Sequence, residues 1–200
     1  MWFAPDPWAA TVRGVNEDPS PRPADLLRPL RRTRQVREFT DDGVAREALD
    51  AIADVARWSG SSRNTQPWRF IVVTEVTTLR RLWTIGVPQT RALETATAAI
   101  AIVLPLDDAH EVGIAYDDGR AAERILIAAG LLDLGAGIAW VRADVRAAVS
   151  EVLGLPAGRY VRTIVALGHP TEAAGRPKSP PGQARLAHDE AIFEERWPKG

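Results

Sequence analysis

The chain has 200 residues, of which 46% are hydrophobic, enough to bury one core and so to form a single main domain. Its 25 basic and 26 acidic side chains nearly cancel, so we expect neither nucleic acid nor a membrane surface as a partner. The absence of cysteine excludes disulfides, thiolate metal sites and a cysteine nucleophile, and it fits a cytoplasmic location. Neither a run of ~18 apolar residues nor a signal-peptide pattern occurs, so no membrane span is expected.

Residues 1–23 contain five prolines and two tryptophans without a periodic pattern, which predicts an extended arm ahead of a domain over 24–200. We expect this arm to lie on the body of the protein or on a second subunit. The alternative is a disordered leader. Asp25 is then expected to cap a short helix that contains Leu26 and Leu30.

The segment 31–37 is strongly basic, with four arginines in seven residues. A solvated basic face is the usual role of such a run. The alternative is an anion site, because the planar guanidinium group matches the geometry of phosphate. Composition alone leaves both interpretations open.

The stretch 58–73 passes directly from a polar loop into an apolar strand. The loop offers small hydroxyl groups, two amides and the pair Pro67-Trp68, so hydrogen-bonding groups stand beside flat apolar surface. A planar ligand that is partly apolar and partly polar needs this chemistry. The alternative is an ordinary connection between a helix and a strand.

Hydrophobic periodicity predicts the remaining elements. Helices are expected over 44–58, 77–83, 120–134 and 144–152, and strands over 70–73, 98–104, 138–141 and 160–168, with Asp144 as a helix cap, Gly135-Ala-Gly137 as the end of the third helix, and a loop over 172–181. Asp117 and Asp118 are interpreted as capping or first-turn residues of the third helix rather than as a metal or acid–base pair. Strands that alternate with helices predict an α/β or α+β sandwich.

The sequence lacks the common catalytic motifs. His110, His169 and His188 are scattered without metal-ligand spacing, and neither a Gly-x-Ser-x-Gly elbow nor a phosphate-binding P-loop occurs. Demanding chemistry would therefore require an organic cofactor. Flavin mononucleotide (FMN) combines a phosphate with a planar polar ring and fits both candidate segments.

Several segments together resemble the FMN-dependent nitroreductase family. They are Thr-Arg-Gln-Val-Arg-Glu-Phe at 33–39, Gly-Ser-Ser-Arg-Asn-Thr-Gln-Pro-Trp-Arg-Phe at 60–70, the helical segment 118–129, Gly-Ala-Gly-Ile-Ala-Trp at 135–140, and Arg185 followed by acidic residues 189–190. The resemblance extends over about 26–197. It implies an α+β, nitroreductase-like sandwich with a central mixed sheet flanked by helices, and a homodimer with two FMN sites at the subunit interface.

The resemblance also implies which residues bind FMN. Arg34 and Arg185 would bind the phosphate, Gln35 and Arg37 the ribityl chain or ring, and Ser61, Ser62 and Asn64 would come from the partner subunit in a loop that includes Gln66, while backbone near Arg142 and Ala143 would approach the reactive flavin nitrogen. A further polar contact is expected from Gln89 or Arg91. No metal and no catalytic side chain are implied, since the flavin carries the chemistry.

The function implied by the resemblance is a ping-pong transfer of hydride from NADH or NADPH, through FMN, to a small organic acceptor such as a nitroaromatic or a quinone. Trp68 or Trp140 would supply an apolar stacking face, although core packing is the favoured interpretation for Trp68. The short segment 83–96 is expected to leave an open site with broad acceptance. The alternatives are other flavin chemistry (dehalogenation, flavin fragmentation or a deazaflavin-linked reaction) and a flavin-binding dimer without turnover.

Overall fold

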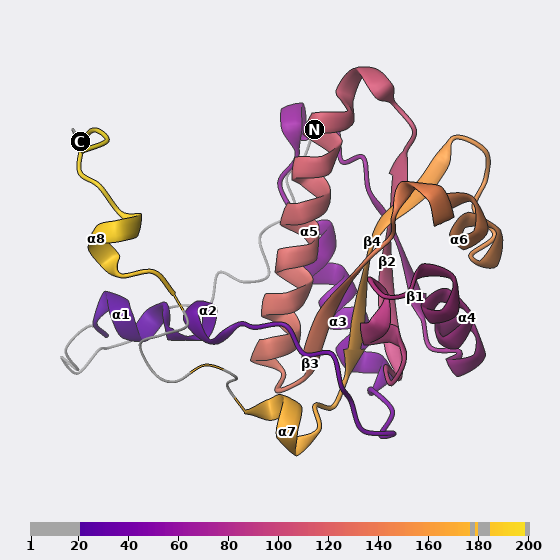
Figure 1. Ribbon diagram of the computed structural model, residues 1–200, viewed down its shortest axis with the longest axis horizontal. Coiled ribbons are helices and arrows are strands. Elements are labelled where there is room, and N and C mark those ends of the chain that lie inside the picture. The colour runs from indigo at the N-terminus through magenta and orange to yellow at the C-terminus, as the bar shows by residue number, and fades with distance from the viewer. Residues whose placement is uncertain (1–20, 177–178, 180–184, 199–200) are drawn as a thin grey trace, which may run out of the picture.

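A four-stranded sheet forms the centre of the computed structural model, which describes residues 21–176, 179 and 185–198 (Figure 1). The strands are β1 (Arg69–Val73), β2 (Ala98–Pro105), β3 (Gly135–Trp140) and β4 (Arg159–Gly168), in the spatial order β1-β2-β4-β3. The arm predicted over 1–23 falls outside the described residues except for its last three positions. The division into an arm and a domain over 24–200 therefore stays a prediction.

All neighbouring strands of this sheet pair antiparallel, so the prediction of a mixed sheet is wrong for the described residues. The reason lies in the position of β4. Strands β2 and β3 run in the same direction and are joined by a connection that contains the helix α5 (Glu111–Leu131). Strand β4 is inserted between them and runs opposite to both, so no parallel pair is formed.

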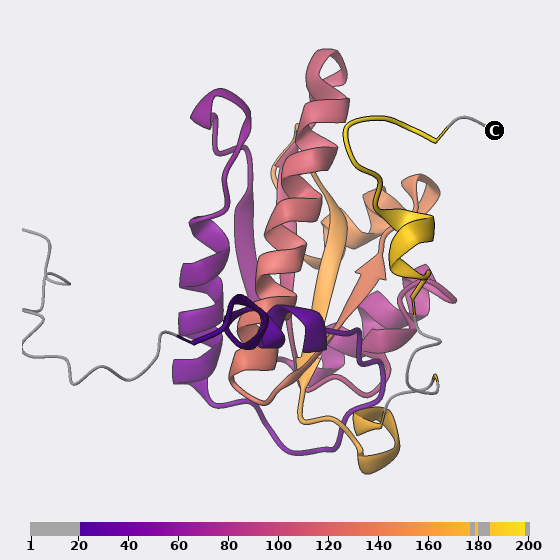
Figure 2. The same cartoon turned by 90° about the vertical axis from the view of Figure 1, so that its left-hand side faces the viewer.

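Strand β2 is buried on both faces, as its continuous apolar run predicts. On one face, Ile100, Ile102 and Leu104 share a core with α3 (Arg46–Arg57) and α5 (Glu111–Leu131). The opposite face carries smaller residues of β2, which pack with α4 (Val76–Gly86) and α6 (Arg146–Val152). Figure 1 shows the resulting three layers side by side, and Figure 2 looks onto the layer of α3 and α5 with the sheet behind it. These layers confirm the predicted sandwich.

Helix α5 begins at Glu111, well before the predicted start at residue 120. Asp117 and Asp118 therefore lie inside the helix, where they are only 3% and 4% exposed, and the prediction that they cap it is wrong. Strand β3 likewise begins at Gly135, so the glycines that were expected to end the helix belong to the strand.

Short elements complete the described chain. They are α1 (Pro23–Leu26), α2 (Arg28–Arg32), α7 (Glu172–Gly175), α8 (His188–Ala191) and the 3₁₀ turns η1 (Ser62–Asn64), η2 (Arg91–Leu93), η3 (Asp108–His110) and η4 (Ala143–Val145). Asp25 lies inside α1 and binds Arg22 and Arg28 instead of capping a helix. Part of the loop predicted over 172–181 forms α7, which Thr171 caps.

The C-terminal segment that carries α8 stands apart from the three layers in Figure 1. Most of its apolar side chains are exposed, with Leu186 at 72% and Trp197 at 77%. Within the described ranges, no helix combines the length and the apolar character needed to cross a membrane.

Candidate functional site

The extended segment around Val36 lies against strand β3. The Val36 amide donates to the Ala136 carbonyl oxygen at 2.7 Å, and the Ile138 amide donates to Gln35 Oε1 at 3.3 Å. Val36 is buried, whereas its neighbours Gln35 and Arg37 remain exposed. Successive side chains of an extended chain point to opposite sides. The Val36 side chain therefore anchors the segment, while the side chains of Gln35 and Arg37 point outward.

The close approach of this segment depends on the glycines of β3. A Cβ atom at Gly137 would lie 2.1 Å from the Val36 carbonyl oxygen, and one at Gly135 would lie 2.9 Å from Val36 Cγ1. No side chain fits at these distances. The Gly135-Ala-Gly137 pattern therefore does not end a helix. It forms the surface on which residues 33–40, the arginine segment, rest.

Side chains from three parts of the chain meet in a cavity of about 380 Å³ beside this contact, and the polar ones come from two of these parts. It is lined by Gln35, Arg37, Pro88, Gln89, Arg91, Ile138 and Trp140. Gln35 and Arg37 were predicted as site residues, and the expected contact near Gln89 or Arg91 falls in the same place. Ile138 and Pro88 carry no sequence signal that distinguishes them from core and loop residues.

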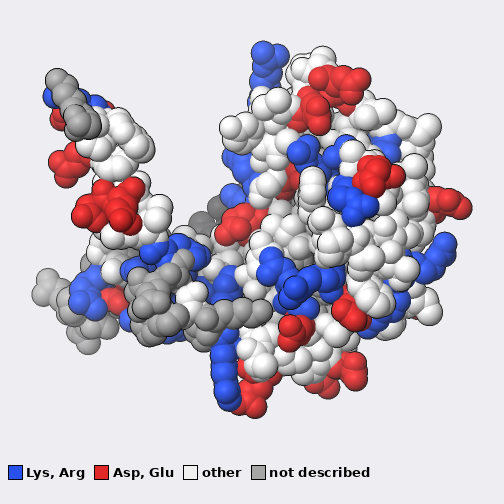
Figure 3. All heavy atoms as spheres, in the orientation of Figure 1, with Lys and Arg blue, Asp and Glu red and all other residues white. Residues whose placement is uncertain are grey.

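The cavity offers hydrogen-bond donors and no carboxylate among its lining residues. Gln35 Oε1 accepts from Arg37 Nη2 at 2.8 Å and from the Ile138 amide, so its NH₂ group is left to donate. On the face seen in Figure 3, Lys and Arg atoms gather where the arginine segment crosses the sheet in Figure 1. The arrangement therefore suits a ligand rich in carbonyl, hydroxyl or phosphate oxygens.

Arg142 lies behind the cavity instead of lining it. Its Nη1 donates to Gln89 Oε1 and to the Val87 carbonyl oxygen, both at 3.1 Å. Its Nε and Nη2 bind the two carboxylate oxygens of Asp144 at 3.0 and 2.9 Å, so Asp144 does not cap α6 as predicted. Arg142 holds the pKa of Asp144 below its usual range through this hydrogen bond.

The two arginines expected at the phosphate do not line the cavity. Arg34 Nη2 donates to the carbonyl oxygen of Gly175 and, at 3.4 Å, to that of Ala174 at the end of α7. Arg185 lies exposed in the C-terminal segment, beyond residues that the structure leaves undescribed. Ala143, at the start of η4, is also absent from the lining.

The loop that contains η1 is held by its own polar groups and by α5. The Gln66 amide donates to Ser61 Oγ at 2.9 Å, and Gln66 Nε2 donates to Asn64 Oδ1 at 3.1 Å. The Ser62 amide donates to Asp117 Oδ2 at 3.2 Å, which gives this buried carboxylate its structural role. Positive φ angles at Arg63 (51°), Asn64 (56°) and Gln66 (48°) show backbone strain of the kind that is concentrated in functional loops.

Within a single subunit, this loop and the arginine segment lie apart. It lies near the start of α5, at the end of the molecule opposite to the crossing of residues 33–40 (Figure 1). It lines a different cleft, together with the η3 turn and Arg159. A site that uses both the serines and the arginine segment therefore requires a second copy of the chain.

The two candidate stacking tryptophans differ in burial. Trp68 is 3% exposed and belongs to the core with α3 and α5, so its role is packing. Trp140 is 46% exposed and lines the cavity beside Ile138. Of the two, only Trp140 has an apolar face available to a ligand.

Comparisons with known proteins agree with this geometry. The model of the nitroreductase family matches residues 30–100. A protein of Archaeoglobus fulgidus, provisionally named NADH dehydrogenase/NAD(P)H nitroreductase, is 31% identical over 157 residues, which are 74% of this chain and 87% of the relative. A Desulfovibrio desulfuricans nitroreductase structure in complex with FMN is 27% identical, with a TM-score of 0.71 over 86% of this chain and 98% of that chain.

A Clostridium acetobutylicum structure described as an NADH oxidase extends the agreement in fold. It is 22% identical and has a TM-score of 0.73 over 84% of this chain and 99% of that chain. The identity and the coverage of the Archaeoglobus relative decide the assignment. The chain belongs to the nitroreductase family.

Proposed function

We propose that the chain is an FMN-dependent oxidoreductase that takes a hydride from NAD(P)H and reduces a small organic acceptor, of the nitroaromatic or quinone type, in a ping-pong cycle. The donor-lined cavity over β3 is the observation that carries this proposal. Membership of the nitroreductase family supports the oxidoreductase class. The FMN in the Desulfovibrio relative supports the choice of cofactor.

The residues around the cavity fit FMN chemically. Bound FMN would supply the group that accepts and donates hydride. Gln35, Arg37 and Gln89 would donate to the oxygens and nitrogens of the flavin, and they would stabilise negative charge that develops there. Trp140 would supply an apolar face. Arg34 and Arg185 are assigned to the phosphate, because a guanidinium pairs strongly with phosphate oxygens.

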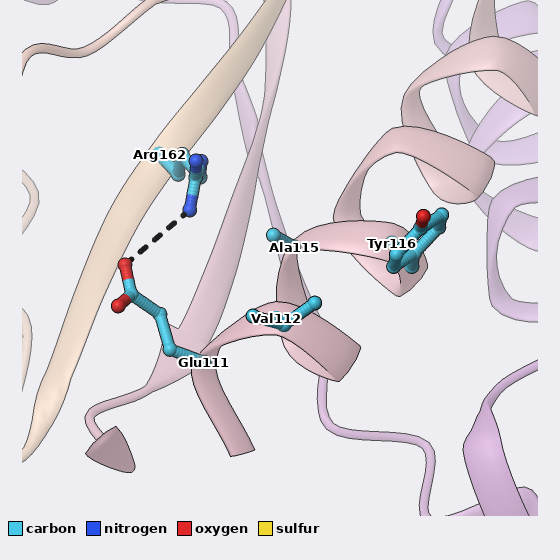
Figure 4. A pocket seen from close by; sticks show the side chains of 5 residues that line it. All are labelled: Glu111, Val112, Ala115, Tyr116 and Arg162. Atoms are coloured by element: carbon cyan, nitrogen blue, oxygen red, sulfur yellow. Dashed lines mark ion pairs between the residues drawn. The ribbon is translucent and has the colours of Figure 1, made fainter. Parts of the chain in front are cut away.

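We further propose a homodimer in which the loop 59–66, the serine loop, of one subunit completes the site of the other. Helix α5 carries an unpartnered apolar surface near its start, where Val112 and Tyr116 are 72% and 73% exposed. Figure 4 shows Val112 and Ala115 beside the Glu111–Arg162 ion pair of 3.8 Å, with Tyr116 farther around the helix. A second copy would cover this surface and bring Ser61, Ser62, Asn64 and Gln66 to the arginine segment.

The absorbance of the purified chain tests the proposed function directly. A yellow dimer whose bound flavin is bleached by NADH or NADPH without oxygen, and recovers colour when a quinone is added, is the expected result. Bleaching without recovery by nitroaromatics or quinones would favour one of the other flavin reactions. A colourless protein that refuses added FMN would overturn the proposal.

Mixing two defective variants is expected to restore flavin binding if the site is shared between subunits. One variant carries Arg34→Ala with Arg37→Ala, and the other carries Ser61→Ala with Asn64→Ala. Random reassembly produces mixed dimers that contain one intact and one doubly defective site, so about a quarter of the wild-type sites should return. Flavin fluorescence quenching measures this fraction. Recovery at the level of the unmixed variants would exclude a shared site.

Arg34→Ala is expected to weaken FMN binding by about 1.5–3 kcal/mol, the range for a hydrogen bond to a charged group. Isothermal titration of the apo-protein with FMN measures the change, and riboflavin, which lacks the phosphate, should bind both forms equally. Arg81→Ala on the exposed side of α4 is the matched control and should bind FMN like the wild type. An unchanged affinity in the Arg34 variant would contradict the phosphate assignment.

A further inference from the structure

The amide of Gln89 has a fixed orientation in the cavity. A guanidinium group donates hydrogen bonds and accepts none, so the Gln89 atom that faces Arg142 Nη1 at 3.1 Å is the oxygen. The NH₂ group consequently takes the other direction. Among the described residues Gln89 Nε2 has no hydrogen-bond partner, while the residue itself lines the cavity.

The guanidinium group of Arg142, which imposes this orientation, is held by hydrogen bonds on two sides. Arg142 is bound by both carboxylate oxygens of Asp144, in the bidentate geometry that best defines the plane of a guanidinium. The same Nη1 that holds Gln89 also donates to the Val87 carbonyl oxygen, two residues earlier in the same loop. Arg142 therefore ties the end of β3 to the 87–89 loop.

From this arrangement we propose that Arg142, clamped by Asp144, is a positioning residue that makes Gln89 present its NH₂ group to the ligand. The inference rests on the proposed function, since the ligand is taken to be FMN and the contact a flavin oxygen or nitrogen. Arg142 acts through its side chain and through Gln89. Without it, the Gln89 amide rotates, and a carbonyl oxygen can face the acceptor groups of the ligand.

A double-mutant cycle on FMN affinity tests the coupling. Gln89→Ala and Arg142→Ala are each expected to lower the affinity about fivefold, as the loss of one neutral hydrogen bond does. Together they should lose no more than either alone, because Arg142 contributes nothing once Gln89 is absent. Arg142→Lys should resemble Arg142→Ala, since an ammonium group lacks the fork that binds Asp144 and Gln89 at once.

Asp144→Asn provides a milder variant in case Arg142→Ala does not fold. It should lower the affinity about twofold in the wild-type background and leave it unchanged in the Gln89→Ala background. Arg46→Ala removes a comparable exposed pair, Arg46–Asp50 at 2.9 Å on α3, and is the matched control, expected to bind FMN like the wild type.

Different results would overturn the proposed function and the positioning role of Arg142. A wild-type chain that binds no FMN would overturn the proposed function and this inference with it. A wild-type chain that binds FMN, with the losses from Gln89→Ala and Arg142→Ala multiplying to about twenty-five-fold, would overturn the positioning role alone. Wild-type affinity in Arg142→Lys would also overturn it.

Discussion

Gly137→Ala is expected to destabilise the protein by about 3 kcal/mol and to abolish most FMN binding. The added Cβ would lie 2.1 Å from the Val36 carbonyl oxygen, a backbone atom that cannot rotate away. The segment that carries Gln35 and Arg37 must then move off β3 and lose the Val36–Ala136 hydrogen bond. A fall in melting temperature of about 6–12 °C measures the first effect, and FMN titration below the new melting temperature measures the second.

Gly43→Ala is the control for this substitution. It lies in the turn before α3, and a Cβ atom there would meet nothing within 4 Å. Its melting temperature and its FMN affinity should match the wild type, because surface substitutions of this kind change stability by less than about 0.5 kcal/mol. Wild-type FMN affinity in Gly137→Ala would mean that the arginine segment does not form the site.

Asp118→Asn is expected to remove a large pH dependence of stability. Asp118 is buried inside α5, where Oδ2 accepts from Thr163 Oγ1 at 2.7 Å and Oδ1 has no hydrogen-bond partner among the described residues. Burial raises the pKa of Asp118 to about 6, against the opposing effects of the Thr163 hydrogen bond and of the Arg162 and Arg146 charges.

The direction of the pH effect follows from the proton count. The reference pKa of the carboxyl group is 3.8, so between about pH 4 and pH 6 the unfolded chain releases this proton first and the native state binds more protons. The stability of the wild type therefore falls as pH rises through this window. The asparagine variant has no such proton, so its stability relative to the wild type should increase by about 2.4 kcal/mol from pH 4 to pH 7.

Urea unfolding of the apo-protein at one fixed protein concentration measures this change. Asp133→Asn is the control, because that carboxylate is exposed and asparagine tolerates its positive φ of 56°. Its relative stability should vary by less than about 0.5 kcal/mol over the same range. A flat difference for Asp118→Asn would show that water or a counter-charge relieves the burial of Asp118.

Local periodicity was sufficient to predict most elements. The apolar run at β2 and the helical spacing of α3 are confirmed because burial of their side chains dominates the local energetics. The start of α5 was missed, because the adjacent aspartates and Gly119 are typical of a helix beginning. Their burial depends on Thr163 and the serine loop, which lie far away along the chain.

The sequence by itself determined the family, the order of the elements and the residue types suited to a flavin, because these depend on local pattern and motif. Only the tertiary structure decided that β4 separates β2 from β3, that Gly137 admits the backbone of Val36, and that Arg142 donates a hydrogen bond to Gln89. The Gln35–Ile138 and Gln89–Arg142 contacts join positions 103 and 53 residues apart. Such contacts exist only after the sheet has brought distant segments together, so no local pattern encodes them.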